Sequence, residues 1–322
     1  MRKICSLVLA VVLLCTVLVL PASAYSSKKD KGTVWEYGEF DLELGEEPLH
    51  VVYYPKAMDN SSEKWPVVVW ANGTGCAPAF YDKLFKGIAE SGYVVVASSN
   101  VMSADGKDQR KSIDYIYSLN DAEGSPFYQK IDKDRIAAVG HSQGGRSSVN
   151  AAQDDKRIKC VVSIAGSNFG SEVKGLKTPT FFITGTFDLI VLSSLWIQPA
   201  YDAAEGPTVY ASLKDGIHTT SMFAPDKIMG YTIKWLDANL KNDPAALAVF
   251  QEGGELASDT GWKDYQSKNL DQLQVGSVLS AGSVWIAAGV AVLAVAAVTV
   301  LVVMKKKKKP AVASGAESKD EE

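Results

Sequence analysis

Short apolar runs alternate with helix-forming stretches along the middle of the chain, and this alternation limits the folds open to it. The apolar runs are rich in β-branched residues and are predicted to be strands at 67–70, 93–97, 136–139, 160–164, 180–184 and 209–213. The stretches between them have helical spacing and predict helices at about 79–91, 110–119, 144–153, 192–204 and 228–240. Strands that are apolar along their whole length lie in parallel sheets with helices on both faces. The sequence therefore predicts an α/β domain.

The flanks of this pattern are less regular. Two apolar runs at 40–44 and 49–54, around Gly45-Glu46-Glu47, predict an opening hairpin. After the last helix, 244–250 is predicted to form one more helix, and 253–271 is polar and contains a tryptophan. The folded domain is expected to cover 25–270.

The first 24 residues have the features of a secretory signal peptide. A basic start precedes an apolar run at 4–20, and Ala22-Ser23-Ala24 supplies the small residues of a cleavage site. An uncleaved signal anchor is the alternative. Pro21 favours cleavage, because it ends the helix just before the small residues.

A second apolar block lies near the other end. Residues 284–304 contain no charged side chain, and a helix of that length spans roughly 30 Å, the thickness of the hydrocarbon core of a bilayer. Five lysines follow at 305–309, which favours a membrane span over a buried core helix. We expect a single-pass membrane protein with an extracytoplasmic domain, a tether at 271–283 and a cytoplasmic tail at 305–322.

The net charge of −4 over 322 residues divides unevenly along the chain. The signal segment and the tail each carry +2, so the part between them carries −8. Such an acidic domain is not expected to bind nucleic acid. With 47% hydrophobic and 22% charged residues, the composition is that of an ordinary folded protein.

Two cysteines remain after removal of the signal segment, Cys76 and Cys160. Cys76 follows the carboxyl end of one predicted strand, and Cys160 lies near the start of another. These positions lie at opposite edges of a parallel sheet, too far apart for a disulfide, which needs Cα atoms within about 7 Å. No Cys/His cluster has metal-ligand spacing, so we predict neither a metal nor a cofactor.

One motif points to chemistry. Gly140-His141-Ser142-Gln143-Gly144 matches G-x-S-x-G and stands between a predicted strand and a predicted helix. A sharp strand-to-helix turn of this kind needs small flanking residues, and it presents the serine hydroxyl at the carboxyl edge of the sheet. A glycine-rich helix start without a function is the alternative interpretation. The context favours Ser142 as a nucleophile.

A serine nucleophile needs a base, and the chain has three histidines. His50 lies in the opening hairpin and is predicted to be structural. His141 occupies the variable position of the motif, where its side chain points away from the hydroxyl. His218 follows the last predicted strand, in the chain order serine, acid, histidine, and is the predicted base.

The acid that orients this histidine is expected at the end of the strand at 180–184. Gly185-Thr186-Phe187-Asp188 follows that strand and makes Asp188 the candidate. Asp215 is the runner-up. Its position only three residues before His218 makes it less suitable. As an alternative without a catalytic role, Asp188 would be a turn residue.

Two backbone N–H groups are needed to bind a developing oxyanion. One is expected from Gln143, the residue after the serine. The other is expected from the glycine-containing loop at 71–76, with the Thr74 N–H as first choice and the Gly75 N–H as second.

The elbow motif, Gly185-Thr186-Phe187-Asp188, His218 and the loop at 70–75 together resemble an α/β-hydrolase. Within that superfamily the chain is most similar to the cutinase, polyester hydrolase and chlorophyllase-like group, with dienelactone hydrolase more distant, over about 34–270. The resemblance implies a mostly parallel sheet of about eight strands and hydrolysis of carboxylic esters through an acyl-enzyme.

The chain departs from that group at two places. Polyester hydrolases usually have an aromatic residue in the oxyanion loop and a tryptophan after the sixth strand, where this chain has Thr74 and Ser167-Asn168-Phe169. These departures argue against polymer binding. No long insertion follows the sixth strand, so no lid domain is expected. The candidate substrate contacts are Gly75, Tyr81, Phe169 and Trp196.

The sequence thus predicts a membrane-anchored serine hydrolase for small or medium esters. Two alternatives remain. The first is a peptidase of the prolyl-oligopeptidase type, a class that normally carries a β-propeller, whose repeats are not seen in this sequence. The second is a binding module without activity on a hydrolase scaffold, which the presence of all three triad residues disfavours.

Overall fold

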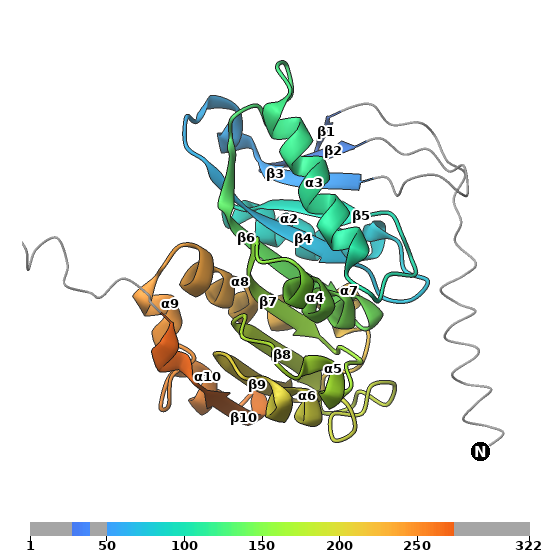
Figure 1. Ribbon diagram of the computed structural model, residues 1–322, viewed down its shortest axis with the longest axis vertical. Helices are drawn as coiled ribbons and strands as arrows, with labels where there is room; N and C mark the ends of the chain where they lie inside the picture. The colour runs from blue at the N-terminus through green and yellow to red at the C-terminus, as the bar shows by residue number, and fades with distance from the viewer. Residues whose placement is uncertain (1–27, 39–49, 274–322) are drawn as a thin grey trace, which may run out of the picture. The chain divides into compact units, whose positions relative to one another are not determined.

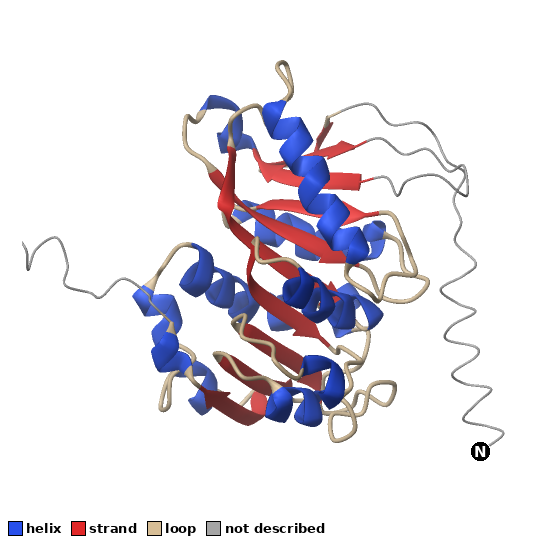
Figure 2. Cartoon of the chain, viewed as in Figure 1, coloured by secondary structure: helices blue, strands red, loops and turns tan. Residues whose placement is uncertain are grey.

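A mixed β-sheet with helices on both faces forms the domain in the computed structural model, which describes residues 28–38 and 50–273 (Figures 1 and 2). Within these residues the sheet has ten strands in the order β1-β2-β3-β5-β4-β6-β7-β8-β9-β10. The strands are β1 (Lys29–Asp30), β2 (Val34–Gly38), β3 (His50–Pro55), β4 (Trp65–Ala71), β5 (Val94–Ser98), β6 (Ile131–His141), β7 (Ile158–Ile164), β8 (Thr180–Gly185), β9 (Thr208–Leu213) and β10 (Trp262–Lys268).

The six strands from β5 to β9 in the sheet order are parallel, and the strands outside them pair antiparallel. In this parallel part Val68 of β4 lies between Val95 of β5 and Ala137 of β6. Because the six strands point the same way, the loops that follow them all emerge at one edge of the sheet. This carboxyl edge is where the candidate site lies.

Helices fill most of the connections between these strands. The α-helices are α2 (Asp82–Glu90), α3 (Lys107–Asp121), α4 (Gln143–Asp154), α5 (Gly170–Val173), α6 (Ile197–Ala203), α7 (Thr220–Phe223), α8 (Asp226–Leu240), α9 (Pro244–Ala248) and α10 (Glu255–Ser258). The described residues also form short 3-10 helices, η1 (Lys56–Asn60), η2 (Pro78–Tyr81) and η3 (Leu270–Gln272).

Two apolar cores lie on the two faces of the sheet, because successive residues of a strand point to opposite sides. On β4, Val68 and Trp70 face one core, which α2 and α8 cover through side chains such as Leu84 and Trp235. Val67 and Val69 face the other core, which α3, α4 and α6 cover. Burial on both faces explains the long apolar runs in these strands, and it confirms the predicted α/β class.

Several predicted boundaries differ from the structure. Over the part of the chain that the structure describes, the sheet has ten strands, not about eight, because β1 and β10 extend it at its two edges. β10 is an edge strand with an irregularity between Lys263 and Gln266, so its polar sequence has no simple strand periodicity. The helix predicted at 192–204 begins at Ile197, after an exposed apolar loop.

The predicted opening hairpin falls only partly within the described residues. β3 pairs with β2 on one side, with Gly38 opposite Val51, and with β5 on the other. Both sides of β3 are therefore occupied by described strands. The segment 40–44 itself lies outside the described residues.

The predicted signal peptide (1–24), membrane helix (284–304) and cytoplasmic tail (305–322) lie outside the described residues, as does most of the tether. Residues 1–275 and 276–322 separate into two units by their contacts. Within 28–38 and 50–273, no helix has both the length and the hydropathy that crossing a bilayer requires.

Neither cysteine forms a disulfide, as the strand positions predicted. Cys160 lies on β7 and Cys76 follows β4, and both are buried. Burial raises the pKa of the Cys160 thiol well above its usual range, so it stays protonated within the core.

Candidate active site

Ser142 stands alone in the turn between β6, which ends at His141, and α4, which begins at Gln143. Its backbone has φ 57° and ψ −121°, a conformation that a residue with a side chain rarely adopts and that costs about 1–3 kcal/mol. The Ser142 N–H donates to the Ile164 carbonyl on β7 at 2.8 Å, which holds the turn against the sheet.

The glycines beside the serine are required by backbone packing. A Cβ on Gly140 would lie 2.2 Å from the Gly144 carbonyl oxygen. A Cβ on Gly144 would lie 2.0 Å from the Ala71 carbonyl oxygen and 2.7 Å from that of Asn72. The turn can therefore pack against β4 and its following loop only with glycine at these positions.

His218 lies between Ser142 and Asp188. Its Nε2 is 2.9 Å from Ser142 Oγ, and its Nδ1 is 2.8 Å from Asp188 Oδ2. These three residues follow β6, β8 and β9, so the parallel sheet brings them to one edge from positions far apart in the chain.

The Asp188 carboxylate is buried, with 4% of the residue exposed, and is held by further hydrogen bonds. Its Oδ1 accepts from the N–H groups of Ile190 and Val191 at 2.9 and 2.8 Å. Asp215, the runner-up acid, is exposed, and its N–H donates to Thr186 Oγ1. The structure thus brings Asp188 to the histidine.

The other two histidines occupy different places. His50 starts β3 and stacks on Tyr115, with 4.4 Å between ring centroids. His141 is buried, and its Nε2 lies 2.7 Å from the backbone carbonyl of His218. Its Nδ1 lies 2.9 Å from the Tyr81 hydroxyl. The sequence assigned His141 no role, whereas in the structure its side chain forms a hydrogen bond with the backbone of His218.

The loop after β4 is fixed at several points. Asn72 Nδ2 donates to the carbonyls of Ser98 and Asn100 at 2.7 and 2.9 Å. The Gly73 N–H donates to the Tyr81 hydroxyl, and the Gly75 N–H donates to the Val101 carbonyl at 2.8 Å.

These contacts decide between the two predicted loop donors. The Gly75 N–H, the second choice of oxyanion donor, is already bonded to the Val101 carbonyl, which favours the first choice. Within the described residues the Thr74 N–H has no intramolecular acceptor, and Thr74 is exposed. The Gln143 N–H is at the first position of α4, where helical N–H groups have no acceptor within the helix.

The predicted substrate residues separate into two groups. Tyr81 is buried, with 1% exposed, and its hydroxyl is bonded to Gly73 and His141, so the prediction of a wall residue is wrong. Phe169 and Trp196 contact each other, with 4.5 Å between ring centroids, and Phe169 is exposed. Trp196 lies in the loop after β8, and the sequence alone does not reveal its contact with Phe169.

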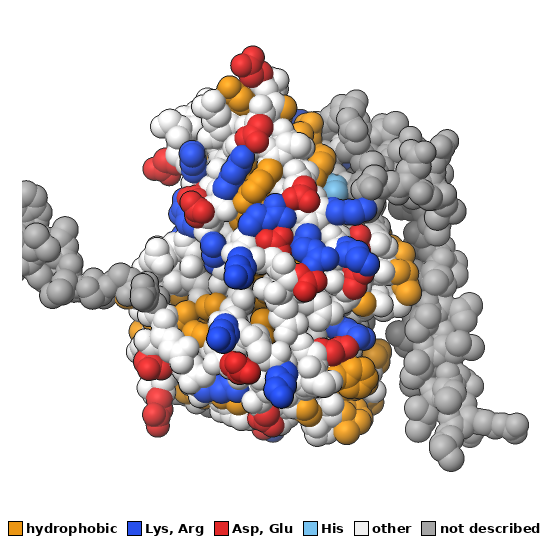
Figure 3. All heavy atoms as spheres, in the orientation of Figure 1, with side chains coloured by type: hydrophobic (Ala, Val, Ile, Leu, Met, Phe, Trp, Pro, Cys, Tyr) orange, Lys and Arg blue, Asp and Glu red, His pale blue; other side chains and the backbone are white. Residues whose placement is uncertain are grey.

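Exposed apolar side chains lie in the loops and in the short helix α7 at the carboxyl edge. We call them the apolar rim: Met102, Phe169, Phe187, Leu189, Ile190, Leu192, Leu195, Ile217 and Phe223. Figure 3 shows apolar side chains at the lower right, in the area where Figure 1 draws α5, α6 and the loop between β8 and α6. An exposed apolar area of this kind indicates a surface that binds an apolar partner or ligand.

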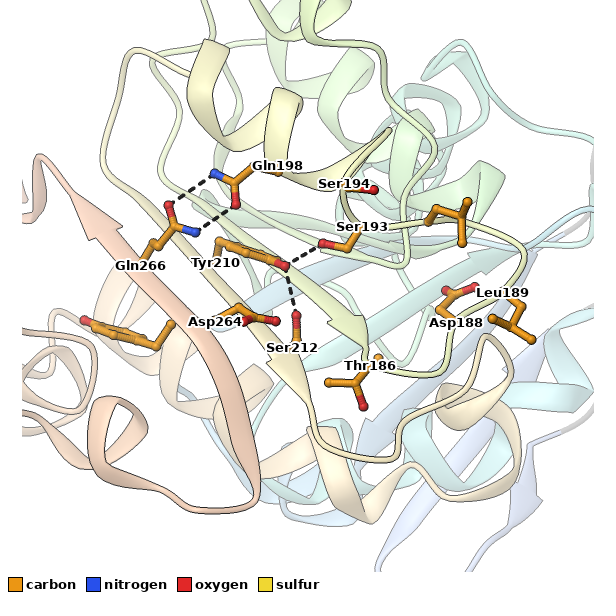
Figure 4. A pocket seen from close by; sticks show the side chains of 13 residues that line it. Thr186, Asp188, Leu189, Ser193, Ser194, Gln198, Tyr210, Ser212, Asp264 and Gln266 are labelled. Atoms are coloured by element: carbon orange, nitrogen blue, oxygen red, sulfur yellow. Dashed lines mark hydrogen bonds between the residues drawn. The ribbon is translucent and has the colours of Figure 1, made fainter.

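A cavity of about 610 Å³ lies beside the loop that carries Asp188, between α6, β9 and β10 (Figure 4). Asp188 lines it, but Ser142 and His218 do not. Some of its polar groups pair with one another: Tyr210 lies between Ser193 and Ser212, and the side-chain amides of Gln198 and Gln266 bond to each other. The cavity is therefore separate from the serine and histidine.

Serine, acid and histidine reach this edge in the chain order that α/β-hydrolases use, on the sheet typical of that class. Residues 50–260, more than half of the chain, match the family described as PET hydrolase-like. The chain belongs to this family.

Curated proteins give a consistent picture. The chain is 29% identical over 202 residues to cutinase est2 of Thermobifida alba, a match that covers 60% of this chain and 64% of the relative. It is 27% identical to cutinase cut1 of Thermobifida fusca, covering 60% of each chain. It is 23% identical to a bis(hydroxyethyl) terephthalate hydrolase of Streptomyces coelicolor, covering 60% of this chain and 62% of the relative. The chain thus spans just under two thirds of the length of these relatives.

Proposed function

We propose that this chain is a serine hydrolase that cleaves carboxylic esters with Ser142, His218 and Asp188. One observation carries the proposal: His218 bonds to Ser142 Oγ through one ring nitrogen and to the buried Asp188 carboxylate through the other. A hydroxyl, an imidazole and a carboxylate in this order can activate an oxygen nucleophile.

The hydrogen bonds define the protonation states needed for attack. The Asp188 carboxylate only accepts hydrogen bonds, so His218 Nδ1 carries the proton and Nε2 presents its lone pair to Ser142 Oγ. Ser142 Oγ attacks the ester carbonyl carbon while Nε2 takes its proton. The resulting imidazolium, stabilised by Asp188, passes that proton to the leaving alcohol.

The negative charge of the tetrahedral intermediate needs donors that are already in place. The N–H groups of Gln143 and Thr74 are proposed to bind this oxygen, since neither has an acceptor within the described residues. Water then attacks the acyl-enzyme, with His218 Nε2 as base, and the acid is released with Ser142 restored.

The substrate is proposed to be a small or medium ester with an apolar acyl or aryl part. The apolar rim supports this, because apolar side chains there would cover such a group. The Phe169–Trp196 pair gives an aromatic surface at the same edge. The names of the relatives, cutinases and a terephthalate ester hydrolase, agree with this chemistry.

The location of the enzyme is also a proposal. The signal-like residues 1–24, the apolar block at 284–304 and the lysines at 305–309 support an extracytoplasmic domain held by one membrane helix. A membrane-impermeant fluorophosphonate applied to intact cells should label Ser142. Labelling only after the cells are opened would contradict this location.

The activity is tested on the full chain, purified in detergent. Wild type should react with a fluorophosphonate probe and hydrolyse p-nitrophenyl esters, and Ser142→Ala should do neither. Absence of both in a folded wild type would favour the binding-module alternative. Labelling together with cleavage of peptides, but not of esters, would favour the peptidase alternative.

A further inference from the structure

A chain of three hydrogen bonds joins the oxyanion loop to the loop of the catalytic histidine. The Gly73 N–H donates to the Tyr81 hydroxyl oxygen at 3.1 Å. The same hydroxyl lies 2.9 Å from His141 Nδ1, and His141 Nε2 lies 2.7 Å from the His218 carbonyl oxygen. The chain starts beside Thr74 and ends on the backbone of His218.

The direction of every proton in this chain is determined. The His218 carbonyl only accepts, so His141 Nε2 must carry the proton. In the neutral ring His141 Nδ1 is then an acceptor, and the Tyr81 O–H must donate to it. The Tyr81 oxygen is left to accept from the Gly73 N–H. No other arrangement of a neutral His141 satisfies all three contacts.

The neutral form of His141 follows from its surroundings. The side chain is buried, and burial, followed by repulsion from His218, lowers the pKa of His141 to about 3. The groups that act on it are His218, the Asp188 carboxylate and the Tyr81 hydroxyl. His141 therefore stays uncharged over the pH range in which a serine hydrolase works.

The packing leaves these groups little freedom. The Tyr81 ring packs against Trp70 and Phe85, with centroids 4.7 and 5.9 Å away. The His141 and His218 rings are 4.9 Å apart. A Cβ on Gly73 would lie 2.9 Å from His141 Nδ1 and 3.1 Å from the Tyr81 hydroxyl. The backbone of this loop therefore packs directly against the two side chains.

We propose that His141 and Tyr81 are positioning residues that hold the His218 loop and the oxyanion loop in fixed relation to each other. This inference rests on the proposed hydrolase function. His141 fixes the backbone from which the His218 ring reaches Ser142, and Tyr81 fixes the backbone next to the Thr74 N–H. Neither side chain touches the substrate. Both act through the residues that do.

The kinetic test uses Tyr81→Phe, which keeps the ring and removes the hydroxyl, and His141→Phe, which removes both ring nitrogens. Each should lower kcat about 10–100-fold with KM changed less than about threefold, because misplaced groups affect the transition state more than binding. His141→Gln retains an N–H donor for the His218 carbonyl and should recover most of the lost kcat.

The double variant Tyr81→Phe/His141→Phe should lose little more than the worse single variant, since both changes break one chain. Tyr93→Phe is the matched control: Tyr93 is a buried tyrosine whose hydroxyl bonds to Asp237. It should change thermal stability without changing kcat. Equal kcat losses in Tyr93→Phe and Tyr81→Phe, or additive losses in the double variant, would overturn the positioning role.

A second measurement does not depend on activity. In the full chain with ¹⁵N-labelled histidine, His141 should show a protonated Nε2 and an unprotonated Nδ1 and should not titrate between pH 5 and 8. Titration near the ordinary histidine pKa, or a proton on Nδ1, would overturn the inference even if the enzyme is active. A wild type that fails to react with fluorophosphonate would instead remove the proposed function.

Discussion

Asp188 and its neighbour Leu189 are adjacent in the chain but lie in opposite environments. The Asp188 carboxylate is buried and receives hydrogen bonds from His218, Ile190 and Val191, whereas Leu189 is 81% exposed. The same contrast separates the hydrogen-bonded centre around Ser142 from the apolar rim. The centre is held by directed hydrogen bonds, whereas the rim consists of exposed apolar side chains.

The contrast has a simple structural cause. Asp188 Oδ1 accepts from two N–H groups of its own loop, which curls the backbone around the carboxylate. The backbone that satisfies the carboxylate leaves the side chains of Phe187, Leu189 and Ile190 exposed. One acidic residue thus bonds to His218 and also leaves these apolar side chains at the surface. We expect changes in the centre to alter the rate and changes in the rim to alter substrate binding.

The largest effect is expected at the carboxylate. Asp188→Asn keeps the shape of the side chain but removes its charge, which orients and stabilises the His218 imidazolium, so kcat should fall about 10³–10⁴-fold. Asp215→Asn is the matched control on the exposed runner-up and should stay within about twofold. Steady-state kinetics with p-nitrophenyl butyrate measure both. Similar losses in the two variants would mean that Asp188 has no special role.

A glycine substitution tests how tightly the centre is packed. Gly144→Ala places a Cβ 2.0 Å from the Ala71 carbonyl, which requires backbone movement and should lower the free energy of unfolding by about 1–3 kcal/mol. Gly230→Ala in α8 meets no atom within 4 Å and should raise it by about 0.5–1 kcal/mol. Urea unfolding of both variants gives the comparison. A neutral Gly144→Ala would show that the turn can relax.

The buried His141 predicts a loss of stability in acid. Its folded pKa of about 3 lies below the ordinary value of 6.5, so between these values the unfolded chain binds the extra proton. The uncharged, buried His141 stabilises the fold fully above pH 6.5, and this stabilisation is lost as the pH falls towards 3. The free energy of unfolding should therefore decrease by roughly 2 kcal/mol from pH 7 to pH 5.

The pH dependence of the free energy of unfolding is measured for wild type and for His141→Gln, in which residue 141 cannot be protonated. The free energy of unfolding of wild type should fall more steeply between pH 7 and pH 5 than that of the variant. Parallel pH dependences would show that His141 is protonated normally in the folded state.

The smallest effect is expected at the rim. Leu189→Ser removes an exposed apolar side chain and should raise KM for p-nitrophenyl octanoate about two- to tenfold, with KM for the acetate unchanged, because only the longer chain reaches the rim. The melting temperature should stay constant. An equal rise of KM for both esters would place Leu189 in contact with the reacting group instead.

Much of the fold follows from local sequence. Each of the parallel strands β4 to β9 contains an apolar run buried on both faces, which can be recognised without a partner. β6 is longer than its apolar run, because it begins with the charged, less buried stretch 132–135. The edge strands are different. β10 contains Lys263 and Asp264 and has an irregular register, so its strand character depends on pairing with β9. The position of β2 depends in the same way on its pairing with β3.

The candidate site likewise contains some features that local sequence predicts and others that depend on tertiary contacts. The glycines around Ser142, the late histidine and the acid after β8 are local signals in a fixed chain order, and they predicted which side chains meet at the sheet edge. Tyr81 and Gly75 were predicted to face the substrate. In the structure the Tyr81 hydroxyl instead forms hydrogen bonds with Gly73 and His141, and the Gly75 N–H donates to the Val101 carbonyl.

The sequence by itself determined the α/β class, the turn at Ser142 and the chain order of serine, acid and histidine. These depend on periodicity, on glycine at crowded positions and on topology, which are written locally in the chain. Only the tertiary structure decided that His141 and Tyr81 link the two loops, that Phe169 meets Trp196, and that the Thr74 N–H has no acceptor in the described residues. Hydrogen-bond partners that lie 60 or more residues apart depend on the packed geometry and have no local pattern.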